Sequence, residues 1–245
     1  MRDYESIEIS HRDGVTELRF HTDGGPLVWN ATAHREIGDA LSELAADRAT
    51  KVVIVTGTGA EFCPGIDRES FAVPHDWEVI WWEGKRIVKG LLELDVPVIG
   101  AVNGPALIHA EIPLLADVVL AADTAVFADK THFTKGSVPG DGVHLIWPFL
   151  LGPRRGKYFL MTAQEIDAAE ALALGVVNEV LAPAALNDRA WELALEWARK
   201  PLPLLRYSRE ALNVFEREAL LAGNGLSHGL ALEGSGFFDA PRKTS

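Results

Sequence analysis

The chain has 245 residues, of which 48% are hydrophobic, and this is enough apolar side chain for the core of one large domain. Its formal net charge of −12 disfavours nucleic acid and anionic membrane surfaces as partners, because no basic stripe offsets the repulsion from their phosphates. Cys63 is the only cysteine, which excludes an intrachain disulfide and a multi-cysteine zinc site and favours a reducing compartment. The N-terminal residues lack a signal-peptide apolar run and no segment reaches transmembrane length, so the sequence predicts a cytoplasmic protein.

The first two thirds of the chain alternate between strand and helix patterns. The predicted elements are strands at 6–10 and 15–20 joined by the turn HRDG, a helix at 33–46, a buried strand at 51–56, a helix at 77–94, and buried strands at 96–102 and 118–122. Strands that alternate with helices indicate an α/β core with right-handed crossovers.

After Pro148 the pattern becomes mainly helical. Helices are predicted at 168–174, 186–199 and 204–221, with a short strand at 176–181 between the first two. The sequence therefore predicts an α/β core, residues 1–183, followed by a helical C-terminal region, residues 184–245.

A turn with the sequence FCPGIDRES follows the buried strand at 51–56 and a loop. Gly65 can adopt backbone conformations closed to other residues, and Asp67 or Ser70 can cap a helix. The Ile66 amide could then bind an oxyanion at a helix N-terminus. An ordinary strand-to-helix turn explains the same residues. GTG at 57–59 is no dinucleotide fingerprint, because the third glycine and the helix opening are missing.

His132 and Asp141 lie on one predicted loop whose glycines and proline can bend the chain back on itself. An imidazole whose Nδ1–H donates to a carboxylate keeps Nε2 free to take a proton from water. The alternative is a surface histidine and a turn aspartate. His144 competes for the role of His132, and it can equally be a half-buried packing residue.

His109 lies in a short apolar turn between two buried strands. It either donates to a developing enolate oxygen or is a satisfied core residue. Glu111 beside it is a helix-start carboxylate, a partner for His109, or solvated, and the sequence leaves these alternatives open.

Tryptophans are numerous, and Trp29, Trp77, Trp81 and Trp82 precede or lie within the region expected to cover these loops. We take Trp29 and Trp82 as candidates for lining an apolar ligand pocket, against the alternative of plain core packing. No group of metal-binding side chains has a recognisable spacing, so neither a metal nor another cofactor is expected.

The segments KVVIVTGTGAEFCPGID and VPVIGAVNGPA, the later GxVPG-type turn and the helical tail resemble the crotonase (enoyl-CoA hydratase/isomerase) superfamily over nearly the whole chain. The resemblance implies a spiral of ββα units in residues 1–183. It also implies that residues 184–245 form a helical trimerisation region, in a homotrimer or a dimer of trimers.

Three positions depart from the hydratase pattern. His109 replaces the glycine whose amide completes the thioester oxyanion hole, Ile112 replaces the first catalytic glutamate, and His132 replaces the second. The departures resemble the superfamily branch of 6-oxocamphor hydrolase and related β-diketone hydrolases, on the segments LVWNATAH, NGPxxxHxEIP and HFxxGxVPGDGxH. This branch implies hydrolysis of a carbon–carbon bond in a cyclic, apolar β-diketone by a retro-Claisen reaction, without a cofactor.

The expected roles follow from that chemistry. His132, oriented by Asp141, deprotonates a water, and His109 meets the enolate charge with help from the Ile66 amide. Trp29 and Trp82 position the diketone. In this branch a glutamate lies in the C-terminal helices, and here Gly229 takes its place while Glu233 follows one helical turn later. The alternatives are an enzyme acting on a coenzyme A thioester and a non-catalytic binding module.

Overall fold

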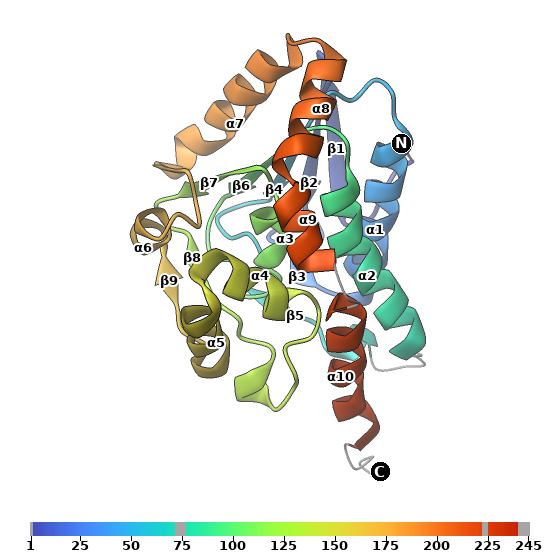
Figure 1. The fold of residues 1–245 in the computed structure, drawn as a ribbon, viewed down its shortest axis with the longest axis vertical. Helices are drawn as coiled ribbons and strands as arrows, with labels where there is room; N and C mark the ends of the chain where they lie inside the picture. Colours follow the sequence, from blue (N-terminus) through green and yellow to red (C-terminus); the bar gives the residue numbers. More distant parts are fainter. Residues whose placement is uncertain (1, 72–76, 222–224, 240–245) are drawn as a thin grey trace.

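A mixed sheet organises the residues that this computed structural model describes, which are 2–71, 77–221 and 225–239 (Figure 1). Within these ranges, six strands lie in the order β1-β2-β4-β6-β7-β10. Their bounds are β1 Ile7–Arg12, β2 Val15–Phe20, β4 Val52–Gly57, β6 Val98–Val102, β7 Val118–Ala122 and β10 Glu179–Leu181. β1 and β2 form the predicted antiparallel hairpin, and every other neighbouring pair is parallel. The predicted α/β class is therefore confirmed.

Helices cover both faces of this sheet. All of β4 is buried, and its side chains alternate between two apolar clusters. Val53 and Val55 pack in the larger cluster with α1 (Ala31–Ala46) and α2 (Trp77–Glu93), whereas Val52 and Ile54 pack in the smaller one with α7 (Pro183–Ala198). A strand buried on both faces needs apolar side chains at successive positions, which explains the unbroken VVIV run of β4.

In the helical C-terminal region, one predicted helix is divided in two. The single helix predicted at 204–221 is two helices, α8 (Leu202–Leu212) and α9 (Val214–Leu221), which meet at Asn213. Asn213 is buried, and its Nδ2 donates to Asp117 Oδ1 at 2.7 Å. Arg209 Nε donates to Asp117 Oδ2 at 2.7 Å. These bonds tie the α8–α9 junction to a residue just before β7, a long-range contact that no local pattern reports.

The remaining elements are short or lie near the candidate site. They are β3 (Val28–Trp29), β5 (Gly65–Ile66), β8 (Val126–Phe127), β9 (Ile166–Asp167), α3 (Glu111–Leu114), α4 (Val143–Leu151), α5 (Pro153–Thr162), α6 (Ala168–Ala173), α10 (Gly225–Asp239) and 3-10 turns at Glu69–Phe71 and Phe133–Lys135. β3 pairs with β5, and β8 pairs with β9. Two-residue strands carry no periodicity, so the sequence does not reveal them. In the described ranges no helix has the length and apolar character needed to span a membrane.

Candidate active site

A cavity of about 170 Å³ lies where β3, β5, α10 and the loops around residues 109, 132 and 141 meet. It is lined by six of the residues that the sequence singled out, namely Trp29, Ile66, His109, His132, Asp141 and Glu233. Phe71, Ile80 and Leu230 add apolar wall. Pockets for drug-sized ligands are roughly 300–1,000 Å³, so this cavity suits a more compact molecule.

Asp129, not Asp141, holds the Nδ1 side of His132. The imidazole Nδ1 donates to Asp129 Oδ1 at 2.8 Å, and the same oxygen accepts the Thr131 backbone N–H at 3.2 Å. Both side chains are buried. The prediction that Asp141 accepts the hydrogen bond from His132 Nδ1 is therefore wrong, because Asp129 accepts it. The loop does bring Asp141 beside the other ring nitrogen, Nε2. Asp129 precedes His132 by three residues, and this spacing is the signal that could have identified it.

The other ring nitrogen of His132 faces two carboxylates. Nε2 lies 3.4 Å from Asp141 Oδ2 and 3.4 Å from Glu233 Oε1. Burial by itself lowers the pKa of His132, but the charge of Asp141 and the hydrogen bonds with Asp129 and Glu233 outweigh it and raise the pKa to about 12. The imidazole is therefore protonated at neutral pH, and His132 alone does not act as the expected free base.

Asp141 lies between the two histidines. Burial raises its pKa to about 6, against the favourable charge of His132. Its Oδ2 lies 3.4 Å from His109 Nδ1 as well as 3.4 Å from His132 Nε2. Asp141 therefore contacts His132 directly and has a pKa close to neutral pH. A general base works best when its pKa lies near the working pH.

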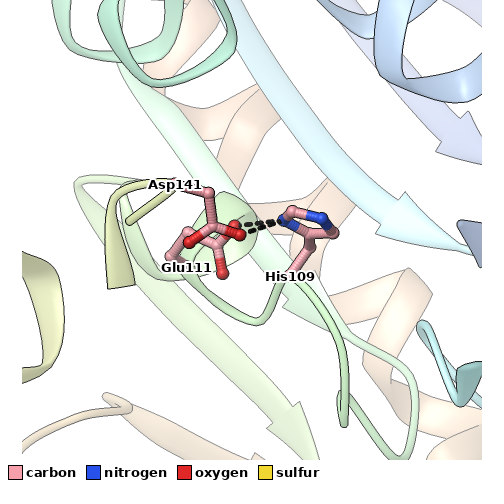
Figure 2. A group of neighbouring side chains, drawn as sticks. All are labelled: His109, Glu111 and Asp141. Carbon is pink, nitrogen blue, oxygen red and sulfur yellow. Dashed lines mark hydrogen bonds and ion pairs between the residues drawn. The ribbon is translucent and has the colours of Figure 1, made fainter. Parts of the chain in front are cut away.

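His109 is held against Glu111 and Trp29. Its Nδ1 forms a hydrogen bond of 2.6 Å with Glu111 Oε1, while Nε2 points away from the two carboxylates (Figure 2). The ring stacks on Trp29 with centroids 3.8 Å apart. Burial lowers the pKa of His109 to about 4 and raises that of Glu111 to about 8. At neutral pH the imidazole is therefore neutral and Glu111 holds a proton. Of the open alternatives for Glu111, the structure supports both the helix start, at α3, and the partner of His109.

The backbone at His109 is strained. Its φ of 51° lies in the left-handed region, which favours glycine. Strain of this kind costs about 1–2 kcal/mol for an L-residue and persists at functional sites where the surroundings over-determine it. A histidine at this position therefore points to a chemical role rather than to a backbone preference.

Glu233 reaches the cavity because α10 lies directly on the loop that carries Asp141. A Cβ atom at Gly140 would lie 2.2 Å from the Gly229 carbonyl oxygen, and one at Gly229 would lie 2.2 Å from His144 Cε1. A glutamate at 229 would not fit this packing. One helical turn later, Glu233 has the room that Gly229 lacks, and its Oε1 contacts His132 Nε2.

The structure shows that neither Trp82 nor His144 lines the cavity. Trp82 is 52% exposed, stacks against Arg86 and does not line the cavity, so its assignment to the ligand pocket is wrong. Trp77, five positions earlier on the same helix, lines the cavity instead. His144 also lies outside the cavity lining, where its Nε2 contacts the Gly225 carbonyl at 3.2 Å, so it is the packing histidine and not a rival of His132.

The fold also assembles two groups of side chains that could hold a metal ion. They are His109, Glu111 and Asp141, and His132, Asp141 and Glu233, with candidate ligand atoms within 4.8 Å of one another in each. The sequence spacing shows neither group, because their members come from separate loops and from α10. In the second group, the bond from His132 Nδ1 to Asp129 would also orient Nε2 toward an ion.

The fold belongs to a known class. The enoyl-CoA hydratase/isomerase family matches residues 13–228, and the chain belongs to this family, the crotonase superfamily. Among curated relatives, it is 27% identical over 229 residues to enoyl-CoA delta isomerase 2 of Homo sapiens, covering 90% of this chain and 57% of the isomerase. It is 37% identical over 193 residues to carnitinyl-CoA dehydratase of Citrobacter koseri, covering 78% and 73% of the two chains. The chain thus spans little more than half of that isomerase.

The chain is also similar to solved structures. A β-diketone hydrolase from the cyanobacterium Anabaena sp. PCC 7120, bound to (S)-3-oxocyclohexyl acetic acid, superposes with a TM-score of 0.90 at 43% identity over 95% of this chain and 94% of that one. An enoyl-CoA hydratase/isomerase from Mycobacterium paratuberculosis superposes with a TM-score of 0.87 at 26% identity over 96% and 95%. The expected crotonase fold is confirmed, and the similarity is greater to this diketone hydrolase than to that hydratase/isomerase.

Proposed function

We propose that the protein hydrolyses a carbon–carbon bond of a compact, apolar β-diketone by a retro-Claisen reaction. One observation carries the proposal. In an apolar cavity, the His132 imidazole is fixed by buried Asp129 and presents Nε2 to Asp141 and Glu233 at 3.4 Å each. The 43% identity with a β-diketone hydrolase supports the same substrate class.

The first step activates water at the His132–Asp141 pair. Because the imidazole is already protonated at neutral pH, the water proton passes to Asp141, whose pKa is raised to about 6. The protonated His132 stays beside the acceptor and donates to the oxygen that becomes the tetrahedral oxyanion. The two groups share protons and therefore titrate as one unit.

The second step breaks the carbon–carbon bond. Hydroxide adds to one carbonyl carbon, the adduct collapses to a carboxylic acid, and the bonding electron pair moves onto the second carbonyl as an enolate. Neutral His109 meets this charge if its Nε2 carries the hydrogen, which requires Glu111 to donate to Nδ1. The raised pKa of Glu111, about 8, provides that proton at neutral pH. Asp141 then returns its proton to the enolate carbon, and the net reaction adds one water to the diketone.

The walls of the cavity suit an uncharged ring. Trp29 stacks on His109 at one side, and Phe71, Ile80 and Leu230 complete an apolar surface. Ile66 lines the cavity from β5, where it pairs with Trp29 across the two-stranded sheet, and its amide is our candidate second oxyanion donor. Glu233 orients the reacting water and His132.

A side-by-side assay tests the proposal. Purified protein is given a bicyclic β-diketone and, separately, crotonyl-CoA, and loss of each substrate is followed. We expect turnover of the diketone and none of crotonyl-CoA. Turnover of the thioester alone would replace the proposal with coenzyme A chemistry, and silence toward broad panels of both would favour a binding module.

We also propose that residues 184–245 assemble the protein into a trimer or a dimer of trimers. Helices α8 and α9 carry large apolar side chains that are exposed in the single chain, among them Tyr207, Leu212 and Phe215. Exposed apolar surface of this kind marks an interaction site. Light scattering coupled to gel filtration should give three or six times the mass of the chain, and a monomer would contradict the assignment.

A further inference from the structure

Arg68 is fixed at the wall of the candidate active site by the segment that carries His132. It follows β5 and lines the cavity, and its Nη2 donates to the Thr131 carbonyl oxygen at 3.1 Å and to Thr131 Oγ1 at 2.8 Å. The Thr131 N–H in turn donates to Asp129 Oδ1 at 3.2 Å. One nitrogen of the guanidinium is therefore committed to the protein and sets its position.

The other guanidinium nitrogens have no such commitment. Within the described part of the chain, Arg68 forms no ion pair with a carboxylate, although Asp141 and Glu233 line the same cavity. Nε and Nη1 have no partner among the described residues, and because they point to different sides of the guanidinium plane, either one can donate a single hydrogen bond to a carboxylate oxygen.

The proposed reaction creates an anion that such a donor can bind. A β-diketone is neutral, whereas its hydrolysis product is a keto acid that ionises at neutral pH. Inside the cavity, the product carboxylate would meet the like charges of Asp141 and Glu233, and Arg68 is positioned to offset that repulsion. We propose that Arg68 binds the carboxylate formed by carbon–carbon bond hydrolysis, an inference that rests on the proposed function.

Calorimetric titration with a matched pair of ligands tests the inference. The probes are 3-oxocyclohexyl acetic acid and its methyl ester, which differ in charge and share the ring. Wild-type protein should bind the acid more tightly than the ester. Arg68→Met should weaken binding of the acid about 10–100-fold, the range for hydrogen bonds to charged groups, and change the ester less than about 3-fold.

Arg48→Met is the matched control, because Arg48 is exposed beyond α1 and its loss removes the same charge away from the cavity. It should leave both affinities unchanged. Equal binding of the acid by wild type and Arg68→Met would overturn the inference, as would an equal loss for acid and ester, since that would mean Arg68 only shapes the cavity.

A kinetic arm separates the two sources of a carboxylate. If Arg68→Met raises KM for a carboxylate-bearing diketone while inhibition by the keto acid product stays unchanged, the recognised group belongs to the substrate and the inference is overturned. If the keto acid binds in an Arg68-dependent manner and no diketone is cleaved, the carboxylate site stands and the proposed function fails. The binding and turnover measurements can therefore refute the carboxylate site and the proposed function independently of each other.

Discussion

Asp141→Asn is the most informative single substitution, because Asp141 touches both histidines of the cavity. The change keeps the size of the side chain and removes its charge and its capacity to accept a proton. Its Oδ2 lies 3.4 Å from His132 Nε2 and 3.4 Å from His109 Nδ1, so both rings should register the change.

The magnitude follows from that distance. Two unit charges 3.4 Å apart interact by about 5 kcal/mol at an effective dielectric constant of about 20. This corresponds to an upper bound of roughly 3–4 pKa units for His132. Loss of the proton acceptor should lower kcat by about 10²–10⁴-fold. The wild-type rate should also fall as pH drops below about 6, where Asp141 takes up a proton, and the variant should lack this step.

Two assays read these effects. Diketone turnover gives kcat across pH, and nitrogen-15 NMR of the histidine rings gives the His132 pKa. Asp123→Asn is the control, since Asp123 is exposed after β7 and the chemical change is the same. A variant that folds with the wild-type melting temperature, keeps kcat within about 3-fold and leaves the His132 resonance unmoved would refute the reasoning.

Four further changes test the site and its supports. Glu111 has a pKa raised from 4.5 to about 8, so the stabilisation from its bound proton is complete below pH 4.5 and is lost as pH rises through 8. Glu111→Gln should therefore flatten the fall in melting temperature between about pH 4.5 and about pH 8, and a parallel fall would contradict this. His109→Gly and His109→Ala should lose similar activity, but urea unfolding should show the glycine variant more stable by about 1 kcal/mol, unless the φ of 51° carries no strain. Gly140→Ala should destabilise by about 1–3 kcal/mol and lower kcat, because the new Cβ would meet the Gly229 carbonyl, whereas Gly25→Ala should do neither; unchanged thermal unfolding of Gly140→Ala would show that α10 yields. Activity should survive dialysis against EDTA, and a loss restored by a divalent ion would instead mean that one of the two candidate ligand groups holds a metal.

The elements that the sequence predicts well are those whose burial alone decides their pattern. The strand at β4 is sandwiched between two apolar clusters, so its composition identifies it without knowledge of its neighbours. The α8–α9 junction has no such local signature, because Asn213 is fixed by Asp117, a residue 96 positions away. The two-residue strands β3 and β5 form only by pairing with each other, and neither segment alone has a pattern that predicts a strand.

Residue types at the site were easier to predict than their pairings. The sequence brings His132, Asp141 and His109 to loops after buried strands, and the fold joins these loops at one cavity. The sequence predicts the wrong acceptor for the His132 Nδ1–H. A loop that bends back shows that His132 and Asp141 are close, but it does not show which ring nitrogen faces which carboxylate. Asp129 was missed because its three-residue spacing to His132 has an ordinary turn as its simplest explanation.

Reaction of the diketone in oxygen-18 water tests the hydrolytic claim most directly. Mass spectrometry should show a keto acid heavier than the diketone by one labelled water, with the label in the new carboxylate, and His132→Ala should form it far more slowly. A product without that oxygen, or wild-type protein that leaves the diketone intact, would contradict carbon–carbon bond hydrolysis by this site.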